Sequence, residues 1–182
     1  VLDDDFAYVV GLGLVRWLGH EAFLTTVNRE LYAMYQADQR ERKVEVLDDV
    51  VLAERDAQRR ARALELGAAG EARTADDWVH AAMLMQHSTV LDDYQRAHEW
   101  ALKAVELDPE HRLARWLAAA AKDRWLMEQG KPQLYGTQYV MEGETWVLAH
   151  RHADPLANGV TVAASAVLGF TSEGLYTTAA SC

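Results

Sequence analysis

The chain has 182 residues, and its 18 basic and 28 acidic side chains give a formal net charge of −10. Half of the residues are hydrophobic and 25% are charged, which is typical of a globular domain with a real core and argues against global disorder. The acidic balance argues against a nucleic-acid-binding protein, which normally presents a basic face. The single cysteine, Cys182, excludes an intramolecular disulfide and a cysteine-rich zinc site.

The longest apolar run is FAYVVGLGLV, at residues 6–15. It is too short for a membrane-spanning helix and contains two glycines. The three aspartates before it have the wrong sign for the start of a signal peptide. We therefore expect a cytoplasmic protein with no membrane partner.

Glycine and proline divide the chain into two helix-rich stretches. Residues 20–66 contain neither, and residues 71–129 contain only Pro109, so both stretches are predicted to be mostly helical. In the first stretch, Arg55, Arg59 and Arg62 share one helix face. Because acidic residues are interspersed there, we interpret this face as solvated, with a basic groove as the alternative.

Local signals place the helix ends in the second stretch. Thr74 is predicted to cap one helix, with two aspartates in its first turn. A second helix is expected at about residues 92–107. Asp108 is predicted to cap a third helix from Pro109 to Gln129, and Gly130 to end it.

Two features complete the predicted fold, which is mainly α. The first is a helical hairpin that resembles the second half of a tetratricopeptide repeat, based on Tyr94, Ala97, Ala101, Ala104, Leu107 and Pro109. The second is a small β-hairpin at residues 139–148, around Glu142-Gly143. We expect a compact helical domain at residues 1–150 and a Ser/Thr/Ala-rich tail at residues 151–182. From residue 153 onward the only charged residues are Asp154 and Glu173.

The loop GKPQLYGTQ, at residues 130–138, is the best candidate for a binding site. Its amides, phenol and hydroxyl can recognise a polar ligand through directional hydrogen bonds, but they are poor nucleophiles and general bases. The alternative is a loop that satisfies its own backbone.

GKPQLYGTQ, preceded by Asp123-Arg124, Gln86-His87 and Asp38-Gln39 with Arg42, resembles a family of bacterial domains of unknown function. That family closes a helical body with a GKPQ-x-YGTQ signature, and the similarity runs from about residue 31 to residue 148. The family has no settled activity, so the resemblance implies a fold and a candidate site. This chain departs from the family pattern after His150. The positions that the resemblance marks are Asp38, His87, Asp123, Arg124, Gln133, Tyr135 and Gln138.

Two residues are candidates for catalysis, although neither is assigned. His87 is interpreted as a core histidine or, alternatively, as a general base beside Arg124. Asp123 lies near the apolar stripe of its helix, where a carboxylate needs a partner. Arg42 or His87 is a better candidate for this partner than Arg124, which is adjacent in sequence and need not face Asp123. His80 and His87 are seven residues apart on one helix, about 10.5 Å along its axis, so one metal ion does not easily reach both. No metal or cofactor is predicted.

The tail ends in TTAASC, which resembles the core segment of thioamitide-like and lanthipeptide precursors. The resemblance implies that a dehydrated Thr177 receives a decarboxylated Cys182, with modifying enzymes as partners and the helical body as a folded leader. The alternative is a frayed terminus. The modification candidates are Thr171, Ser172, Thr177, Thr178 and Cys182.

Three functions follow from these patterns. The first is a non-catalytic binding domain for a polar ligand or a protein partner near the YGTQ loop. The second is a precursor of a ribosomally synthesised, modified peptide. The third is a small hydrolase-like enzyme that uses His87 and Asp123/Arg124.

Overall fold

The computed structural model describes residues 26–43, 48–143 and 145–149. Within these residues the chain is mainly helical with one small β-hairpin, which confirms the predicted fold class. The elements are α2 (Arg29–Glu41), α3 (Asp49–Ala68), α4 (Ala75–Gln86), α5 (Leu91–Leu107), α6 (Arg112–Glu128), β1 (Tyr139–Glu142) and β2 (Thr145–Leu148).

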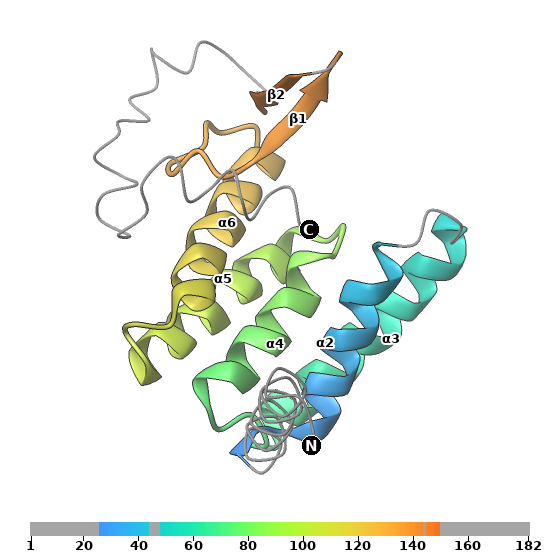
Figure 1. Ribbon diagram of the computed structural model, residues 1–182, viewed down its shortest axis with the longest axis vertical. Coiled ribbons are helices and arrows are strands. Elements are labelled where there is room, and N and C mark those ends of the chain that lie inside the picture. The colour runs from blue at the N-terminus through green and yellow to red at the C-terminus, as the bar shows by residue number, and fades with distance from the viewer. Residues whose placement is uncertain (1–25, 44–47, 144, 150–182) are drawn as a thin grey trace, which may run out of the picture.

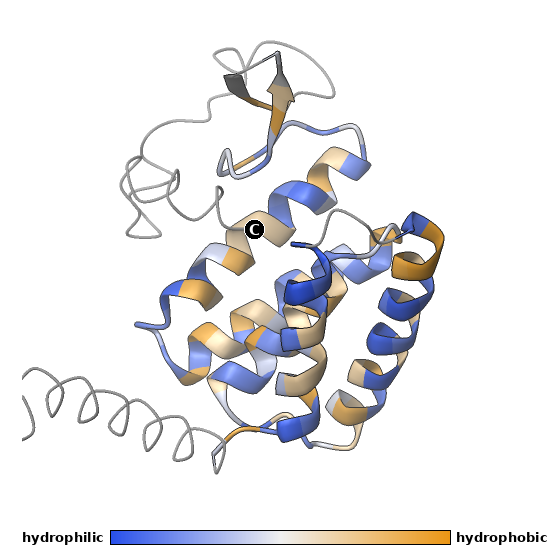
Figure 2. Cartoon of the chain, turned by 45° about the vertical axis from the view of Figure 1, so that its right-hand side comes forward, coloured by the Kyte–Doolittle hydropathy of each residue, from blue (hydrophilic) through white to orange (hydrophobic). Residues whose placement is uncertain are grey.

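Helix α4 lies at the centre of the bundle. It packs against α2 and α3 on one side and against α5 and α6 on the other (Figure 1). Every residue of α4 from Val79 to Gln86 is buried, as expected for a helix that is covered all round. In contrast, the body of α3 is hydrophilic (Figure 2).

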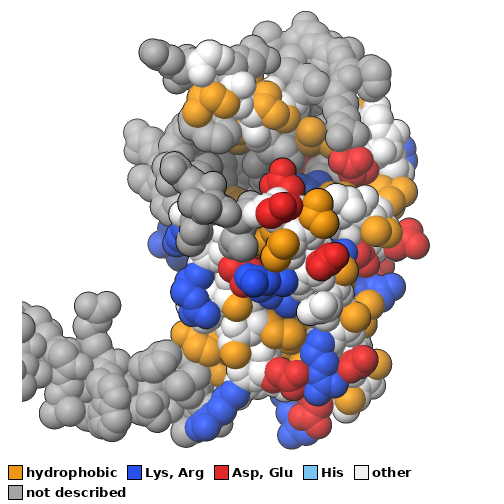
Figure 3. All heavy atoms as spheres, turned by 90° about the vertical axis from the view of Figure 1, so that its right-hand side faces the viewer, with side chains coloured by type: hydrophobic (Ala, Val, Ile, Leu, Met, Phe, Trp, Pro, Cys, Tyr) orange, Lys and Arg blue, Asp and Glu red, His pale blue; other side chains and the backbone are white. Residues whose placement is uncertain are grey.

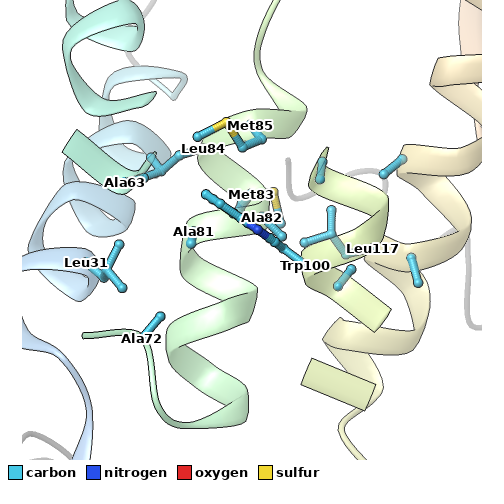
Figure 4. Packing of buried hydrophobic residues seen from close by; sticks show 14 of the residues in the cluster. Leu31, Ala63, Ala72, Ala81, Ala82, Met83, Leu84, Met85, Trp100 and Leu117 are labelled. Atoms are coloured by element: carbon cyan, nitrogen blue, oxygen red, sulfur yellow. The ribbon is translucent and has the colours of Figure 1, made fainter. Parts of the chain in front are cut away.

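The core combines a few large side chains with many alanines. Leu31, Met85 and Leu117 are fully buried, and Trp100 lies among them (Figure 4). Burying a side chain of this size contributes about 1.5–3 kcal/mol. The alanines let neighbouring helices approach closely and come from α3, α4, α5 and α6: Ala63, Ala81, Ala82, Ala97, Ala101, Ala118 and Ala121.

The start of α4 forms as predicted. The hydroxyl of Thr74 accepts the backbone N–H of Asp77, and Asp77 Oδ2 accepts the N–H of Thr74, which is a capping box. Asp77 is only 1% exposed, and it also accepts the backbone N–H groups of Arg73 and Asn28. The bond from Asn28, the cap of α2, ties the starts of α2 and α4 together.

The predicted start of α6 is wrong. Helix α6 begins at Arg112, and His111 caps it by accepting the N–H of Ala114 through Nδ1. Asp108 instead follows the end of α5, where its carboxylate accepts the N–H of Glu110. Proline therefore marks the turn between two helices here and not the first residue of the second helix. The predicted stop is correct, because Gly130 has φ +71° directly after the end of α6.

The arginines of α3 form ion pairs with α2. Arg55 and Arg59 both bind Glu41, and Arg62 binds Glu30 at 2.6 Å. Basic and acidic side chains are intermixed on this face of the molecule (Figure 3). The face is therefore an interhelical ion-pair network, and the alternative of a basic groove is wrong.

The β-hairpin forms where it was predicted. β1 and β2 pair antiparallel, with Glu142 opposite Thr145 and Tyr139 opposite Leu148. Gly143 has φ +63°, in the left-handed region that glycine adopts without strain.

Of the α5 residues on which the tetratricopeptide resemblance is based, Tyr94, Ala97, Ala101 and Ala104 are buried, whereas Leu107 is exposed. The likeness to a tetratricopeptide repeat stays a prediction. No helix in the described part of the chain is long and apolar enough to cross a membrane, and the apolar run at residues 6–15 lies outside that part.

His80 makes stability depend on pH. The imidazole is 5% exposed and stacks on Tyr35 with ring centroids 4.7 Å apart. Burial lowers the pKa of His80 from 6.5 to about 4, and the charges of Asp76 and Asp77 oppose this only in part. The unfolded chain thus binds a proton between these two pH values that the folded chain does not bind.

We therefore expect stability to fall as the pH drops from 6.5 to 4, by up to about 1.4 kcal/mol per pH unit from this group. His80→Phe should flatten that slope in urea titrations at several pH values. An NMR titration of the His80 ring with a midpoint near 6.5 would contradict the prediction.

Candidate functional site

The GKPQLYGTQ loop is folded around the carboxylate of Asp123, on α6. Oδ1 accepts the backbone N–H groups of Leu134 (2.7 Å) and Tyr135 (2.9 Å). Oδ2 accepts the N–H (2.9 Å) and the hydroxyl (2.8 Å) of Thr137. Asp123 is 0% exposed, so these four donors replace the water that the charge loses on burial. The prediction that Arg42 or His87 pairs with Asp123 is wrong, because the hydrogen-bond donors to this carboxylate come from the loop.

Gln133 closes the same loop. Its Nε2 donates to the carbonyl oxygens of Gln138 and Ala149, and its Oε1 accepts the N–H of Gln138. Gln133 is buried, and Gly136 allows the tight turn with φ +70°. The loop therefore wraps the end of α6 next to β1, as the orange segment of Figure 1 shows.

Arg124, the next residue of α6, connects the loop to α4. Its Nε and Nη2 donate to Gln138 Oε1 at 3.2 and 3.0 Å, and its Nη1 donates to the carbonyl of Gln86 at 2.7 Å. The guanidinium also lies 5.8 Å from the centre of the Tyr94 ring. Within the described part of the chain it forms no ion pair with a carboxylate.

A second cluster joins α2, α3 and the end of α4. Arg42 Nη2 lies 3.0 Å from Asp38 Oδ1 and 2.6 Å from Asp56 Oδ2. His87 Nδ1 lies 2.9 Å from Asp38 Oδ2. Burial raises the pKa of Asp38, but the hydrogen bond and charge of His87 and the charge of Arg42 outweigh burial, so the pKa is lowered.

His87 Nδ1 has two competing partners. Arg42 Nε can donate to it at 2.8 Å, whereas Asp38 Oδ1, at 3.0 Å, can only accept from it. A ring nitrogen either carries a proton or accepts one, so the two hydrogen bonds exclude each other. Only one of these two hydrogen bonds can therefore form at a time.

A pocket of about 240 Å³ lies between these two clusters. His87, Arg124 and Gln138 line it, and each comes from a different segment of the chain. Asp38, Asp123, Gln133 and Tyr135 do not line it. The remaining lining residues are Gln39, Arg42, Lys43, Met83, Gln86, Trp116, Thr137 and Tyr139.

The structure thus separates the predicted binding residues by role. Arg124 and Gln138 line the pocket. Asp38 does not line it but contacts two residues that do, His87 and Arg42. Gln133 stabilises the loop through hydrogen bonds to its backbone. Tyr135 contributes its backbone N–H to Asp123. Of the two catalytic candidates, His87 faces the pocket and Asp123 is enclosed by the loop.

Sequence reasoning did not single out Lys43, Gln86 or Trp116 as site residues. Gln86 precedes His87 in the Gln86-His87 element of the family resemblance, and this was the one sequence feature that could have marked it as a site residue. Lys43 directly follows Arg42, but a basic pair on a charged helix does not distinguish a pocket wall from solvated surface. Trp116 recurs with other apolar residues at helical spacing, and sequence periodicity cannot show that this face of the helix also borders a cavity.

No group of three or more metal-ligating side chains occurs among residues 26–43, 48–143 and 145–149. The tail at residues 151–182, with its five modification candidates, lies outside these residues.

Comparisons with protein-family models, with curated proteins and with solved structures find no match for this chain. The resemblance to the GKPQ-x-YGTQ family therefore stays a prediction, and so does the resemblance to modified-peptide precursors. The fold and the site define the molecule as a helical domain with a pocket that polar and apolar side chains line together.

Asp123→Ala should strongly destabilise the fold, because it leaves three backbone N–H groups of the loop without their acceptor. We expect a loss of about 3 kcal/mol or more in urea denaturation. Glu106→Ala, at an exposed position on α5, is the matched control and should change stability by less than about 0.5 kcal/mol. Equal stability of the two variants would contradict the anchoring role of Asp123.

Proposed function

We propose that this chain is a binding domain for a small polar ligand, which occupies the pocket between α2, α4, α6 and the YGTQ loop. The observation that carries this proposal is the convergence of four separate segments on one pocket. Each segment contributes a side chain that can form hydrogen bonds: Gln39, His87, Arg124 and Gln138.

The way the pocket walls are held also supports a binding role. Thr137 is fixed by Asp123, and Gln138 is fixed by Arg124. Preorganised polar groups bind a ligand with less loss of conformational entropy than mobile ones. A pocket with a few oriented polar groups set in an apolar wall, here Met83 and Trp116, is the usual form of a small-molecule site.

A pocket-blocking variant tests this proposal. Gln39→Trp places a large side chain at the wall, and Arg40→Trp makes a similar change at the next, exposed position of α2, which does not line the pocket. In a thermal-shift screen of neutral, anionic and cationic small polar compounds, we expect at least one compound to stabilise the wild type and Arg40→Trp but not Gln39→Trp.

Circular dichroism of each variant without ligand checks that the helices are intact. If no compound separates the two variants, the pocket is not a small-molecule site and the proposal fails.

A hydrolase-like enzyme is the second candidate function, and the contact between Asp38 and His87 favours it. A carboxylate on Nδ1 orients an imidazole so that Nε2 can act as a general base. His87 lines the pocket, and its Nε2 has no hydrogen-bond partner in the described part of the chain. Asp38 takes the supporting position here, because Asp123 is occupied by the loop.

If the domain is an enzyme, His87→Gln should lower hydrolysis of p-nitrophenyl acetate or p-nitrophenyl phosphate by about 100-fold or more, the usual loss when a general base is removed. His98→Gln, on α5 and outside the pocket, is the control. Equal turnover by the two variants, or no turnover by the wild type above the buffer rate, would argue for binding alone.

A further inference from the structure

We propose that the ligand of this pocket carries an anionic group, a carboxylate or a phosphate monoester, together with a hydroxyl or amine donor. This inference rests on the proposed binding function and adds the chemical class of the ligand.

The sign of the charge in the pocket is opposite to that of the chain. The whole protein has a formal net charge of −10. Even so, the charged residues that line the described pocket are Arg42, Lys43 and Arg124, and no acidic side chain is among them. Because acidic residues outnumber basic ones, a random sample of this surface would favour the opposite sign.

Two of these three cations form no ion pair with a carboxylate among the described residues. Arg42 is paired with Asp38 and Asp56. Lys43 is exposed and forms no ion pair within the described residues. Arg124 donates to two neutral oxygens, those of the Gln138 amide and the Gln86 backbone. The unpaired positive charge therefore lies at the pocket, whereas Arg42 is paired with the carboxylates of Asp38 and Asp56.

Arg124 retains the capacity to bind an anion. A guanidinium has five N–H donors, and the hydrogen bonds to Gln138 and Gln86 use three of them. Burial lowers the pKa of Arg124, and the nearby charge of Arg42 lowers it further, against the opposing effects of Tyr94 and of the Glu128 carboxylate. A bound anion would offset both unfavourable effects, and arginine pairs well with carboxylate and phosphate.

Gln86 indicates the second group of the ligand. It is 3% exposed and lines the pocket, and its Oε1 has no hydrogen-bond partner in the described structure. A buried carbonyl oxygen without a partner is unfavourable, and an N–H or O–H donor would satisfy it. A small hydroxy acid or a phosphorylated polyol carries both the anion and the donor, whereas chloride is an anion without a donor.

Isothermal titration of the full chain with glycerate, glycerol 3-phosphate and glycerol, at matched ionic strength, tests this inference. The three probes share a hydroxylated carbon chain and differ in the anionic group. We expect at least one of the two anions to bind and glycerol not to bind. Lys43→Gln should weaken binding of that anion about tenfold, the effect expected for the loss of one charged contact.

Lys103→Gln is the matched control, because it removes the same charge at an exposed position of α5 outside the pocket. It should leave the affinity unchanged. The inference is overturned if neither anion binds, if glycerol binds as tightly as the anions, or if the two lysine variants bind alike. A neutral library compound that Gln39→Trp excludes, together with no binding of either anion, would leave the binding function standing and remove only the anionic class.

Discussion

The buried carboxylate of Asp123 is the constraint on which the site depends. A carboxylate held entirely away from water is very unfavourable unless donors surround it, and its four donors all come from residues 134–137. The loop can supply these donors only in a wrapped conformation. That conformation places Thr137 and Gln138 at the pocket, so one interaction in the interior fixes one wall of the site.

Asp77, at the start of α4, is a second buried carboxylate that backbone N–H groups stabilise. It is almost fully buried and accepts backbone N–H groups from Asn28, Arg73 and Thr74. In both places a carboxylate on a helix organises a non-helical segment, because irregular backbone carries N–H groups that no helix satisfies. The bundle therefore uses buried acidic side chains as anchors for its connections, and its acidic composition is partly a structural requirement.

The charges of the molecule are segregated by the way the helices pack. Between α2 and α3 the arginines and carboxylates are matched, in pairs such as Arg59 with Glu41 and Arg62 with Glu30. At the pocket, Lys43 and Arg124 lack such partners in the described structure. The pocket lies at the C-terminal ends of α2 and α4, beside a loop that contains no acidic residue.

The sequence by itself determined the helical class, the cap at Thr74, the stop at Gly130 and the hairpin around Gly143. These features depend on local spacing and backbone preferences within a few residues, which a linear pattern contains. It also indicated that Asp123 needs a partner, because a carboxylate beside an apolar stripe cannot remain unpaired. Only the tertiary structure decided which partner it has, that Asp108 belongs to a turn, and that Arg124, His87 and Gln138 share a pocket. Those outcomes depend on how distant segments pack, and the sum of many weak interhelical contacts is not encoded in any short stretch of sequence.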